Sequence, residues 1–205
     1  MYYKILDKKR LNLLPLFGFL KKDFYLAGGT ALALQIGHRD SIDFDFFTKI
    51  DFIPKELFKK VKTTFQGYKI KKTKEEKNTL YVVLDEDVKV SFLTYKYQLI
   101  KPLIDDKELY LASILDIASM KLSAIIDRAK NKDYIDLYFI LQRYSLEKIL
   151  SYTQKKFPTI DIGLVLKSLV YFEDIEFENI KFIDQKIDFL EIKNFLEKQV
   201  EQYAK

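Results

Sequence analysis

The pattern of hydrophobic and polar positions separates a first half with strand-like alternation from a second half with helical spacing. Apolar residues follow one another from Phe24 to Ala27, and from Ile42 to Phe47 apolar residues alternate with carboxylates. Alternation with a period of two returns over residues 68–72, 79–84 and 88–93. These five segments predict a mixed sheet of about five strands.

Helical spacing marks segments that flank the predicted strands. Residues from about Asp7 to Lys22 carry apolar side chains at helical intervals, and Pro15 is expected to break or restart that helix. We expect a short helix over residues 31–36, opened by Thr30, and another over residues 53–61 with proline in its first turn. The charge run over residues 71–78 predicts a solvated loop.

The second half of the chain, from Lys101-Pro102 onward, has helical composition. Helices are expected over residues 111–130, 134–143, 146–156, 162–172 and 189–203. The sequence therefore predicts the α+β class, with an α/β domain in residues 1–100 and a helical domain in residues 101–205.

The stretch from Phe24 to Phe47 joins a glycine turn to two carboxylates. Gly28 and Gly29 fall between a predicted strand and a predicted helix, where glycine lets the backbone approach a ligand and the helix start favours phosphate. Asp43 and Asp45 are two positions apart on a predicted strand, so their side chains share one face.

The other residues of that strand, Ile42, Phe44 and Phe46, are expected to pack the opposite face. Neighbouring carboxylates repel unless a cation lies between them, and Mg²⁺ is commonly held by two carboxylates together with substrate phosphates. An ordinary tight turn and the solvated face of an edge strand are the alternatives. Because aspartate is depleted in strands, we favour a magnesium–triphosphate site.

Composition indicates a globular protein. The chain has 205 residues, of which 48% are hydrophobic and 32% charged, enough for one large domain or two small lobes. It has no cysteine, which excludes disulfides and thiolate zinc sites. The net charge of +5 permits contact with a polyanion. Without a signal-peptide core or a bilayer-spanning apolar run, we expect a cytoplasmic protein without a membrane partner.

The motif formed by Gly28-Gly29-Thr30-Ala31-Leu32, His38-Arg39, Ser41 and Asp43-x-Asp45 resembles a family signature. It is similar to that of the AbiEii/AbiGii-type abortive-infection nucleotidyltransferase toxins, a branch of the DNA-polymerase-β-like nucleotidyltransferases. The resemblance implies a polymerase-β-like domain in which Asp43 and Asp45 hold Mg²⁺. It also implies a nucleotide-binding set consisting of Gly28, Gly29, Thr30, Arg39, Ser41 and Lys121. His38, the only histidine, is interpreted as structural or phosphate-orienting rather than as a general base.

Lys121 lies on an inward-looking stripe of the predicted helix over residues 111–130. Burial there invites an anionic partner, and a snorkelling lysine at a packing edge is the alternative. The segment that carries Lys121, Arg128, Asp133 and Asp136 is similar to a second motif block of the same family. The resemblance implies that Lys121 contacts nucleotide phosphate and that Asp133 completes the catalytic group as a possible base. Asp133 is also expected to cap the next helix, and Asp136 to pair with Arg128 or Lys132.

One position departs from the family pattern. Ser91, on the predicted strand over residues 88–93, stands where a third strand carboxylate is usual, and Asp87 has the same parity but falls in a predicted turn. A third acid helps hold the metal or accepts the proton of the attacking hydroxyl. Two interpretations remain open: an active transferase that uses Asp133 or Asp87, and a nucleotide-binding protein without turnover.

The resemblance, which covers nearly the whole chain, implies a Mg²⁺-dependent enzyme. It would transfer NMP from an NTP to a hydroxyl acceptor, with tRNA or another RNA as the expected acceptor. As a toxin of a toxin–antitoxin system it would have a cognate antitoxin protein. A small-molecule acceptor, as in antibiotic nucleotidyltransferases, is the alternative within this enzyme class. A protein-interaction module is the alternative outside it.

Overall fold

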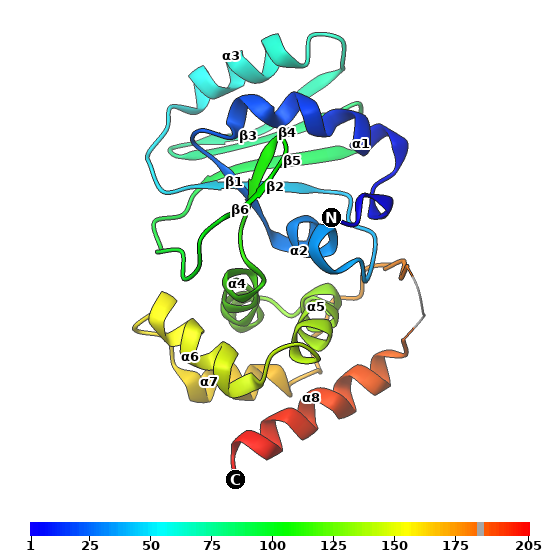
Figure 1. Ribbon diagram of the computed structural model, residues 1–205, viewed down its shortest axis with the longest axis vertical. Helices are drawn as coiled ribbons and strands as arrows, with labels where there is room; N and C mark the ends of the chain where they lie inside the picture. Colours follow the sequence, from blue (N-terminus) through cyan, green and yellow to red (C-terminus); the bar gives the residue numbers. More distant parts are fainter. Residues whose placement is uncertain (184–186) are drawn as a thin grey trace. The chain divides into compact units, whose positions relative to one another are not determined.

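The computed structural model describes residues 1–183 and 187–205, and the chain divides into two compact units (Figure 1). The first unit consists of residues 1–37, 41–97 and 103–112. The second unit consists of residues 38–40, 98–102 and 113–205. Short pieces of the N-terminal half, residues 38–40 and 98–102, therefore belong to the second unit.

A seven-stranded mixed sheet forms the centre of the first unit, in the order β3-β4-β5-β2-β1-β7-β6. Its strands are β1 (Tyr25–Ala27), β2 (Phe44–Thr48), β3 (Ile70–Glu76), β4 (Thr79–Leu84), β5 (Val88–Thr94), β6 (Ile104–Asp106) and β7 (Leu109–Leu111). The pairs β1–β7 and β2–β5 are parallel and the other pairs are antiparallel. The predicted α+β class and mixed sheet are confirmed.

Two parts of the sheet differ from the prediction of about five strands. The charged run expected to be a loop forms most of β3, an edge strand that pairs with β4 and carries a bulge between Lys72 and Lys74. Lysines on an edge strand discourage further strand pairing, so a charged sequence is compatible with this position. The short strands β6 and β7 occupy residues 104–111, where helical composition was expected to begin.

The first unit also contains η1 (Tyr3–Ile5), α1 (Lys8–Leu13), η2 (Leu14–Leu20), α2 (Gly28–Ile36) and α3 (Pro54–Thr64). Pro15 lies at the start of η2, so the predicted restart of the helix is confirmed. The ring of Phe17 lies 4.9–5.2 Å from the rings of Phe44, Phe46 and Phe65. Since Phe44 and Phe46 pack into this core, the intervening Asp45 points to the other face of the sheet.

Ile42 does not join that core as predicted. Ile42 is 52% exposed, because β2 begins only at Phe44. Asp43 therefore lies in the turn directly before the strand rather than within it. Asp43 and Asp45 still flank Phe44 along the chain.

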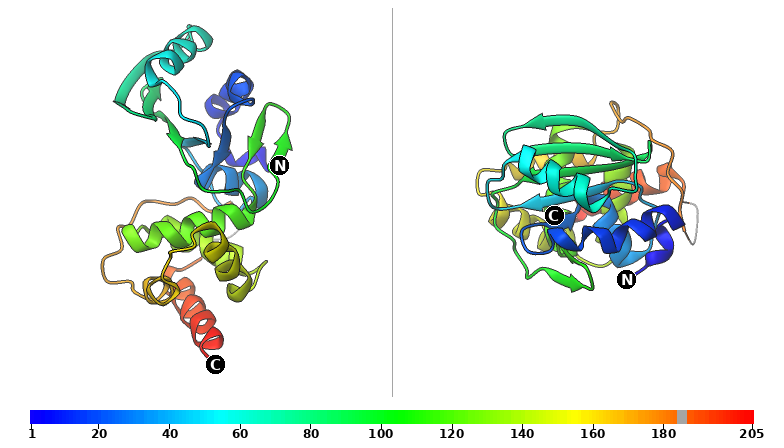
Figure 2. Two further views of the ribbon diagram at one scale, coloured as in Figure 1. Left: turned by 90° about the vertical axis from the view of Figure 1, so that its left-hand side faces the viewer. Right: turned by 90° about the horizontal axis from the view of Figure 1, so that it is seen from above.

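Five helices make up most of the second unit (Figure 2). They are α4 (Ile114–Asp127), α5 (Asn131–Leu141), α6 (Leu146–Lys156), α7 (Ile162–Leu169) and α8 (Phe189–Tyr203). Helix α4 packs against α5, α6 and α7, and α8 packs against the same three helices. The predicted C-terminal helices are confirmed. Among the helices described, none combines the length and apolarity needed to cross a membrane.

A buried carboxylate, Asp116, fixes residues 98–102 to the helices of the second unit. It accepts hydrogen bonds from the backbone N–H groups of Ile100 (2.9 Å) and Lys101 (3.2 Å) and from the hydroxyl of Ser113 (2.7 Å). The ammonium of Lys156 lies 2.9 Å from its Oδ1. Both members of this ion pair have fully buried side chains, so their charges are compensated within the fold.

Candidate active site

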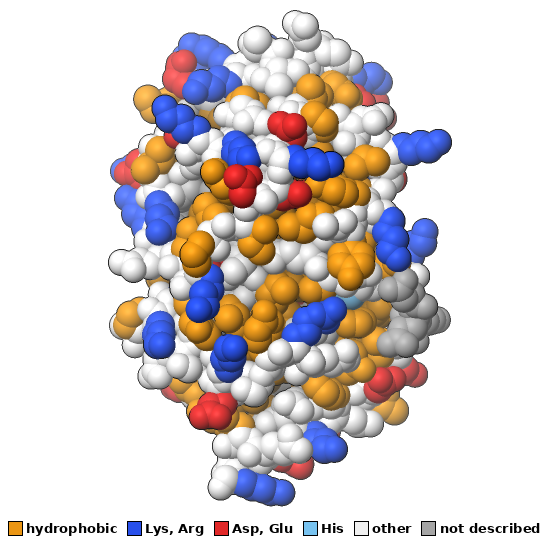
Figure 3. Space-filling model, viewed as in Figure 1, with side chains coloured by type: hydrophobic (Ala, Val, Ile, Leu, Met, Phe, Trp, Pro, Cys, Tyr) orange, Lys and Arg blue, Asp and Glu red, His pale blue; other side chains and the backbone are white. Residues whose placement is uncertain are grey.

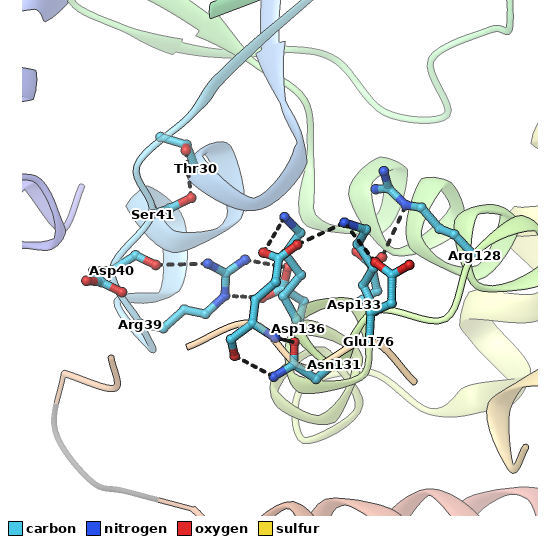
Figure 4. A network of polar contacts seen from close by, with 12 residues as sticks. Thr30, Arg39, Asp40, Ser41, Arg128, Asn131, Asp133, Asp136 and Glu176 are labelled. Atoms are coloured by element: carbon cyan, nitrogen blue, oxygen red, sulfur yellow. Dashed lines mark hydrogen bonds and ion pairs between the residues drawn. The ribbon is translucent and has the colours of Figure 1, made fainter. Parts of the chain in front are cut away.

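The residues predicted for the site fall into two groups, one on each unit. Gly28, Gly29, Thr30, Ser41, Asp43, Asp45 and Ser91 belong to the first unit, and His38, Arg39, Lys121, Asp133 and Asp136 belong to the second. Figure 4 shows polar contacts from both groups: the Thr30–Ser41 pair of the first, and the network around Asp133 and Asp136 of the second.

Gly28 brings the backbone against a site carboxylate. It has φ +68°, a conformation that favours glycine, and it begins α2 directly after β1. A Cβ added to Gly28 would lie 2.9 Å from Oδ2 of Asp45. The preceding residue, Ala27, pairs with Asp45 in the sheet and offers no side-chain cap to α2. The first N–H groups of α2 therefore keep their capacity to bind an anion beside this carboxylate.

Asp45 is oriented by the neighbouring strand. It lies opposite Ser91 in the parallel β2–β5 register, and the Ser91 hydroxyl donates a short hydrogen bond to Oδ1 of Asp45. The structure thus places Ser91 on the strand where the third carboxylate was sought. With Oδ1 bonded to Ser91 and Oδ2 facing Gly28, both oxygens of Asp45 have defined positions.

Thr30 and Ser41 fix the turn that carries Asp43. The Thr30 hydroxyl donates a short hydrogen bond to the backbone carbonyl of Asp43 and lies 2.7 Å from the Ser41 hydroxyl. A hydroxyl has one hydrogen to donate, so Ser41 donates to Thr30. Both residues are buried, and Oδ1 of Asp43 is buried as well. The direct contacts of Thr30 and Ser41 therefore hold Asp43 in position.

The donor set of the first unit fits one Mg²⁺ held by two protein carboxylates. Asp43 and Asp45 are the acids available, because Asp87 pairs with Lys9 and Arg10 instead. Within residues 1–183 and 187–205, no group of three or more His, Cys, Asp or Glu side chains is arranged to hold a metal. Mg²⁺ often takes one or two carboxylates and completes its shell with water and phosphate oxygens.

Lys121 of α4 is buried against two carboxylates of α5. Its ammonium lies 2.6 Å from Oδ1 of Asp133 and 2.6 Å from Oδ2 of Asp136. Burial opposes the charge on Lys121, but Asp136 and Asp133 outweigh that effect and raise its pKa. Of the two alternatives for Lys121, the structure shows burial rather than snorkelling, and its anionic partners here are carboxylates of the chain itself.

Asp136 lies at the centre of the second group. Its Oδ1 accepts from Nε of Arg39 and Nε2 of His38, each at 2.7 Å, and its Oδ2 accepts from Nη2 of Arg39 at 2.9 Å. Burial alone would raise the pKa of Asp136, but Arg39 and Lys121 hold it well below its usual value. Asp136 is therefore an anion that binds three cationic or donating side chains and fixes residues 38–40 to α5.

The prediction that Asp136 pairs with Arg128 or Lys132 was wrong. Arg128 approaches Asp133 instead, with 3.5 Å between Nε and Oδ2, and Lys132 pairs with Glu178 at 2.9 Å. Because Lys132 and then Lys130 donate hydrogen bonds to it, Glu178 has its pKa lowered to about 2. Lysines near the start of α5 thus bind Glu178, whereas Asp136 binds His38 and Arg39.

Asp133 does not cap α5. The helix starts at Asn131 with Lys130 at the cap position, and Asp133 lies in the first turn with its side chain fully buried. Its Oδ1 binds Lys121, whereas its Oδ2 is buried without a hydrogen bond from the described residues. A carboxylate oxygen of this kind can still accept a proton or a hydrogen bond from a ligand.

His38 has the contacts of a structural residue, as predicted. Its side chain is 1% exposed, and its ring packs 4.9 Å from that of Phe139. Burial lowers the pKa of His38 even though the hydrogen bond with Asp136 opposes this. The imidazole is therefore neutral, with Nε2–H donating to Asp136.

The neutral state of His38 predicts a loss of stability in mild acid. Unfolding restores its ordinary pKa, so the unfolded chain binds an extra proton once the pH falls below about 6.5. The free energy of unfolding should decline below that pH by up to about 1.4 kcal/mol per pH unit. Urea titrations between pH 7.5 and 5 measure this, and His38→Gln should flatten the dependence. A slope that is equal in both proteins would contradict the assignment.

The role of Asp136 as the common partner of His38 and Arg39 was not predicted. Ninety-seven positions separate Arg39 from Asp136 along the chain, and no local periodicity links them. The available signal was indirect: two adjacent basic or titratable residues, His38 and Arg39, in a segment that becomes buried. Buried charges require partners, so a buried Asp on a helix was a candidate.

Comparisons with known proteins agree with this geometry. Residues 16–202 match the profile of the family described as "Nucleotidyl transferase AbiEii toxin, Type IV TA system". An uncharacterized protein of Aquifex aeolicus (strain VF5), aq_aa25, is 37% identical over 192 residues, which covers 88% of each chain. This relative and the profile span nearly all of the described elements.

Three solved structures share the fold at low identity. MenT4, the nucleotidyltransferase toxin Rv2826c of Mycobacterium tuberculosis H37Rv, has a TM-score of 0.64 at 14% identity, covering 93% of this chain and 80% of its own. JHP933 of Helicobacter pylori has a TM-score of 0.59 at 18% identity, covering 97% and 91%. The antibiotic-resistance factor ANT(2'')-Ia has a TM-score of 0.52 at 11% identity, covering 72% and 91%. At these identities the likeness establishes the fold. Because the family profile covers the glycine turn, both carboxylates and the Lys121 network, the chain belongs to the AbiEii nucleotidyltransferase toxin family.

Proposed function

We propose that this protein transfers NMP from an NTP to a hydroxyl group of an acceptor, with release of pyrophosphate. The observation that carries the proposal is the approach of Gly28, at the half-buried start of a helix without a side-chain cap, to the carboxylate of Asp45. That arrangement supports the proposal because backbone N–H groups that can bind an anion lie beside a carboxylate of the kind that holds Mg²⁺. Membership of a nucleotidyltransferase toxin family supports the same chemistry.

In this proposal Asp43 and Asp45 hold Mg²⁺, which would offset charge on the phosphates of the bound nucleotide. The backbone N–H groups from Gly28 to Thr30 bind the β- and γ-phosphates. Ser91 keeps Asp45 aimed at the metal position through its hydrogen bond to Oδ1. Thr30 holds Asp43 in position through the hydrogen bond that its hydroxyl donates to the Asp43 carbonyl.

The second unit contributes a cation and a base. The acceptor oxygen forms a bond to the α-phosphorus, the bond from that phosphorus to the bridging oxygen breaks, and the hydroxyl proton passes to Asp133. Lys121 stabilises the developing negative charge. The contact with Asp133 keeps the buried Lys121 charged. Arg39 contributes through its bond to Asp136, and Ser41 through its hydrogen bond with Thr30.

For the acceptor we propose RNA, with tRNA as the first candidate. The net charge of +5 favours a polyanionic acceptor over a neutral small molecule. The type IV toxin–antitoxin description of the family supports a toxin role and a cognate antitoxin protein. A small-molecule acceptor is the alternative that the structural likeness to ANT(2'')-Ia favours.

The test uses α-labelled NTPs, Mg²⁺ and total cellular RNA with the wild-type protein and Asp45→Asn. We expect label on RNA with wild type, and a rate lower by about a hundredfold or more in the variant, because a metal ligand supplies several kcal/mol. Asp105→Asn is the matched control, since its exposed carboxylate forms a surface ion pair with Lys21. This control should label RNA at the wild-type rate.

Three other results would redirect the proposal. Labelling of a small molecule without RNA would assign an antibiotic-type acceptor. Binding of Mg²⁺–NTP without any labelled product would identify a nucleotide-binding protein without turnover, which the serine at position 91 favours. Equal labelling by wild type and Asp45→Asn would exclude the proposed metal site.

A further inference from the structure

The outward face of α6 carries alternating lysines and tyrosines. Lys148, Tyr152 and Lys155 recur at intervals of four and three residues, so they form one stripe along α6, and Tyr144 lies just before the start of the helix. The opposite face is buried in the helical unit. Lys101, from the segment of residues 98–102, joins the stripe at Tyr152. We call these five residues the α6 ridge.

Each lysine of the α6 ridge lies over a tyrosine ring. The ammonium of Lys148 lies 5.1 Å from the centroid of the Tyr144 ring. Those of Lys101 and Lys155 are each 5.4 Å from the centroid of Tyr152. Cation–π contacts of this kind leave the ammonium N–H groups accessible to an anion. The three lysines are exposed and the two tyrosines are half-buried.

Within the part of the chain that the structure describes, carboxylates do not neutralise the lysines of the α6 ridge. Among the described residues, no Asp or Glu forms an ion pair with Lys101, Lys148 or Lys155. Elsewhere, Lys72 and Lys74 also lie over aromatic rings, but each is paired with a glutamate. Figure 3 shows Lys and Arg side chains gathered over α4 and α6 on the face that it draws.

A buried hydrogen-bond network holds the two segments that carry the α6 ridge. Lys156, which follows Lys155, is buried and bonds both Asp116 (2.9 Å) and the carbonyl of Gln98 (2.8 Å). Asp116 also accepts from the backbone N–H of Lys101. One buried network thus fixes both segments that supply the ridge, which lowers the entropy lost when a ligand binds across them.

We propose that the α6 ridge binds the single-stranded end of an RNA acceptor. Lys148 and Lys155 on α6, together with Lys101 over the Tyr152 ring, match successive phosphates, and the tyrosine rings offer surfaces on which bases stack once a lysine turns to a phosphate. The inference rests on the proposed function, since it assigns the acceptor of that reaction to α6. The helix packs against α4, which carries Lys121, through the Thr153–Ser119 hydrogen bond of 3.1 Å.

The chemistry of the ridge favours RNA over an acidic protein surface. Regular alternation of cation and aromatic ring suits a polymer that itself alternates charge and flat base. A protein partner would instead require a largely apolar centre, and the centre of the ridge carries Lys148 and Lys155. Binding of a protein but not RNA at this face is an outcome of the test.

The test measures binding of a fluorescent single-stranded RNA by anisotropy, without NTP, over a range of salt concentrations. Replacing Lys148 and Lys155 by glutamine should reduce the slope of log K against log salt by about 1.4, since each lost phosphate contact contributes about 0.7. Tyr152→Leu should weaken binding by about fivefold or more through lost stacking. Circular dichroism and urea unfolding verify that the variants fold.

The matched control is Lys59→Gln/Lys69→Gln, which removes the same charge from exposed lysines that pair with glutamates on the first unit. It should leave RNA affinity close to wild type. Equal losses in both double variants would show a non-specific charge effect and overturn the proposal. Unchanged RNA binding in the ridge variant would also overturn it.

The same proteins distinguish failure of this inference from failure of the proposed function. Asp45→Asn should abolish labelling yet bind RNA as wild type does, because Asp45 is not part of the ridge. If wild type labels RNA but the ridge variant labels it equally well at limiting RNA, only the ridge assignment is wrong. If wild type labels no acceptor while RNA binding still depends on the ridge, the transfer proposal fails alone.

Discussion

Asp136→Ala is expected to lower the free energy of unfolding by about 3–5 kcal/mol, the usual cost of removing one partner from a buried ion pair. The side chains of Asp136, Arg39 and Lys121 are at most 8% exposed, so two cations would lose a common anion without gaining water. Urea unfolding at pH 7.5 measures the loss. Because the pKa of Asp136 is held well below its usual value, the difference between the proteins should shrink only in strong acid.

A second change identifies the cause of this loss. In Asp136→Ala/Arg39→Met the guanidinium that has lost Asp136 is replaced by an apolar side chain, while Lys121 keeps its contact with Asp133. If uncompensated buried charge is responsible, the double variant should be more stable than Asp136→Ala alone. Glu56→Ala, which removes an exposed partner of Lys59, should leave unfolding nearly unchanged. A double variant that is no more stable than the single one would indicate lost packing instead.

The parts of the fold with strong local patterns were predictable from sequence. In β4 and β5, buried and exposed positions alternate along the strands as the sequence does. The glycine turn and the Asp43-x-Asp45 spacing were likewise local signals, and the structure brings Gly28 against Asp45. Helices α6 and α8, with apolar stripes at helical spacing, have the predicted bounds.

Other parts depend on tertiary context that no short window contains. β3 is a strand because β4 offers it a partner, although its own residues are mostly charged and exposed. The strands β6 and β7 have three residues each, too few to show a period. The burial of Lys121 could be inferred from its stripe, but the choice of Asp136 as the shared partner of Lys121 and Arg39 requires the assembled helices.

Substitution of Gly28 should have the largest effect on the chemistry. In Gly28→Ala, the new Cβ would lie 2.9 Å from Oδ2 of Asp45, and alanine at φ +68° is strained by about 1–2 kcal/mol. The carboxylate, already held by Ser91, has to shift, and the backbone can no longer approach it as closely. We expect transfer to fall by about a hundredfold or more, because the proposed metal ligand and the proposed phosphate-binding turn beside it are both displaced. Initial labelling rates and Mg²⁺–NTP titrations measure this.

Two other glycines of the first unit separate the effect at the site from general strain. Gly37 has φ +70°, and its added Cβ would meet the ring of Tyr2 rather than a carboxylate. Gly37→Ala should therefore lose stability but retain Mg²⁺–NTP binding. At Gly67 an added Cβ meets nothing within 4 Å, so Gly67→Ala should behave as wild type. If Gly28→Ala and Gly37→Ala lose stability alike and both keep full nucleotide binding, Gly28 is needed only for its backbone conformation. Loss of binding in Gly28→Ala alone would instead place the nucleotide at the turn beside Asp45.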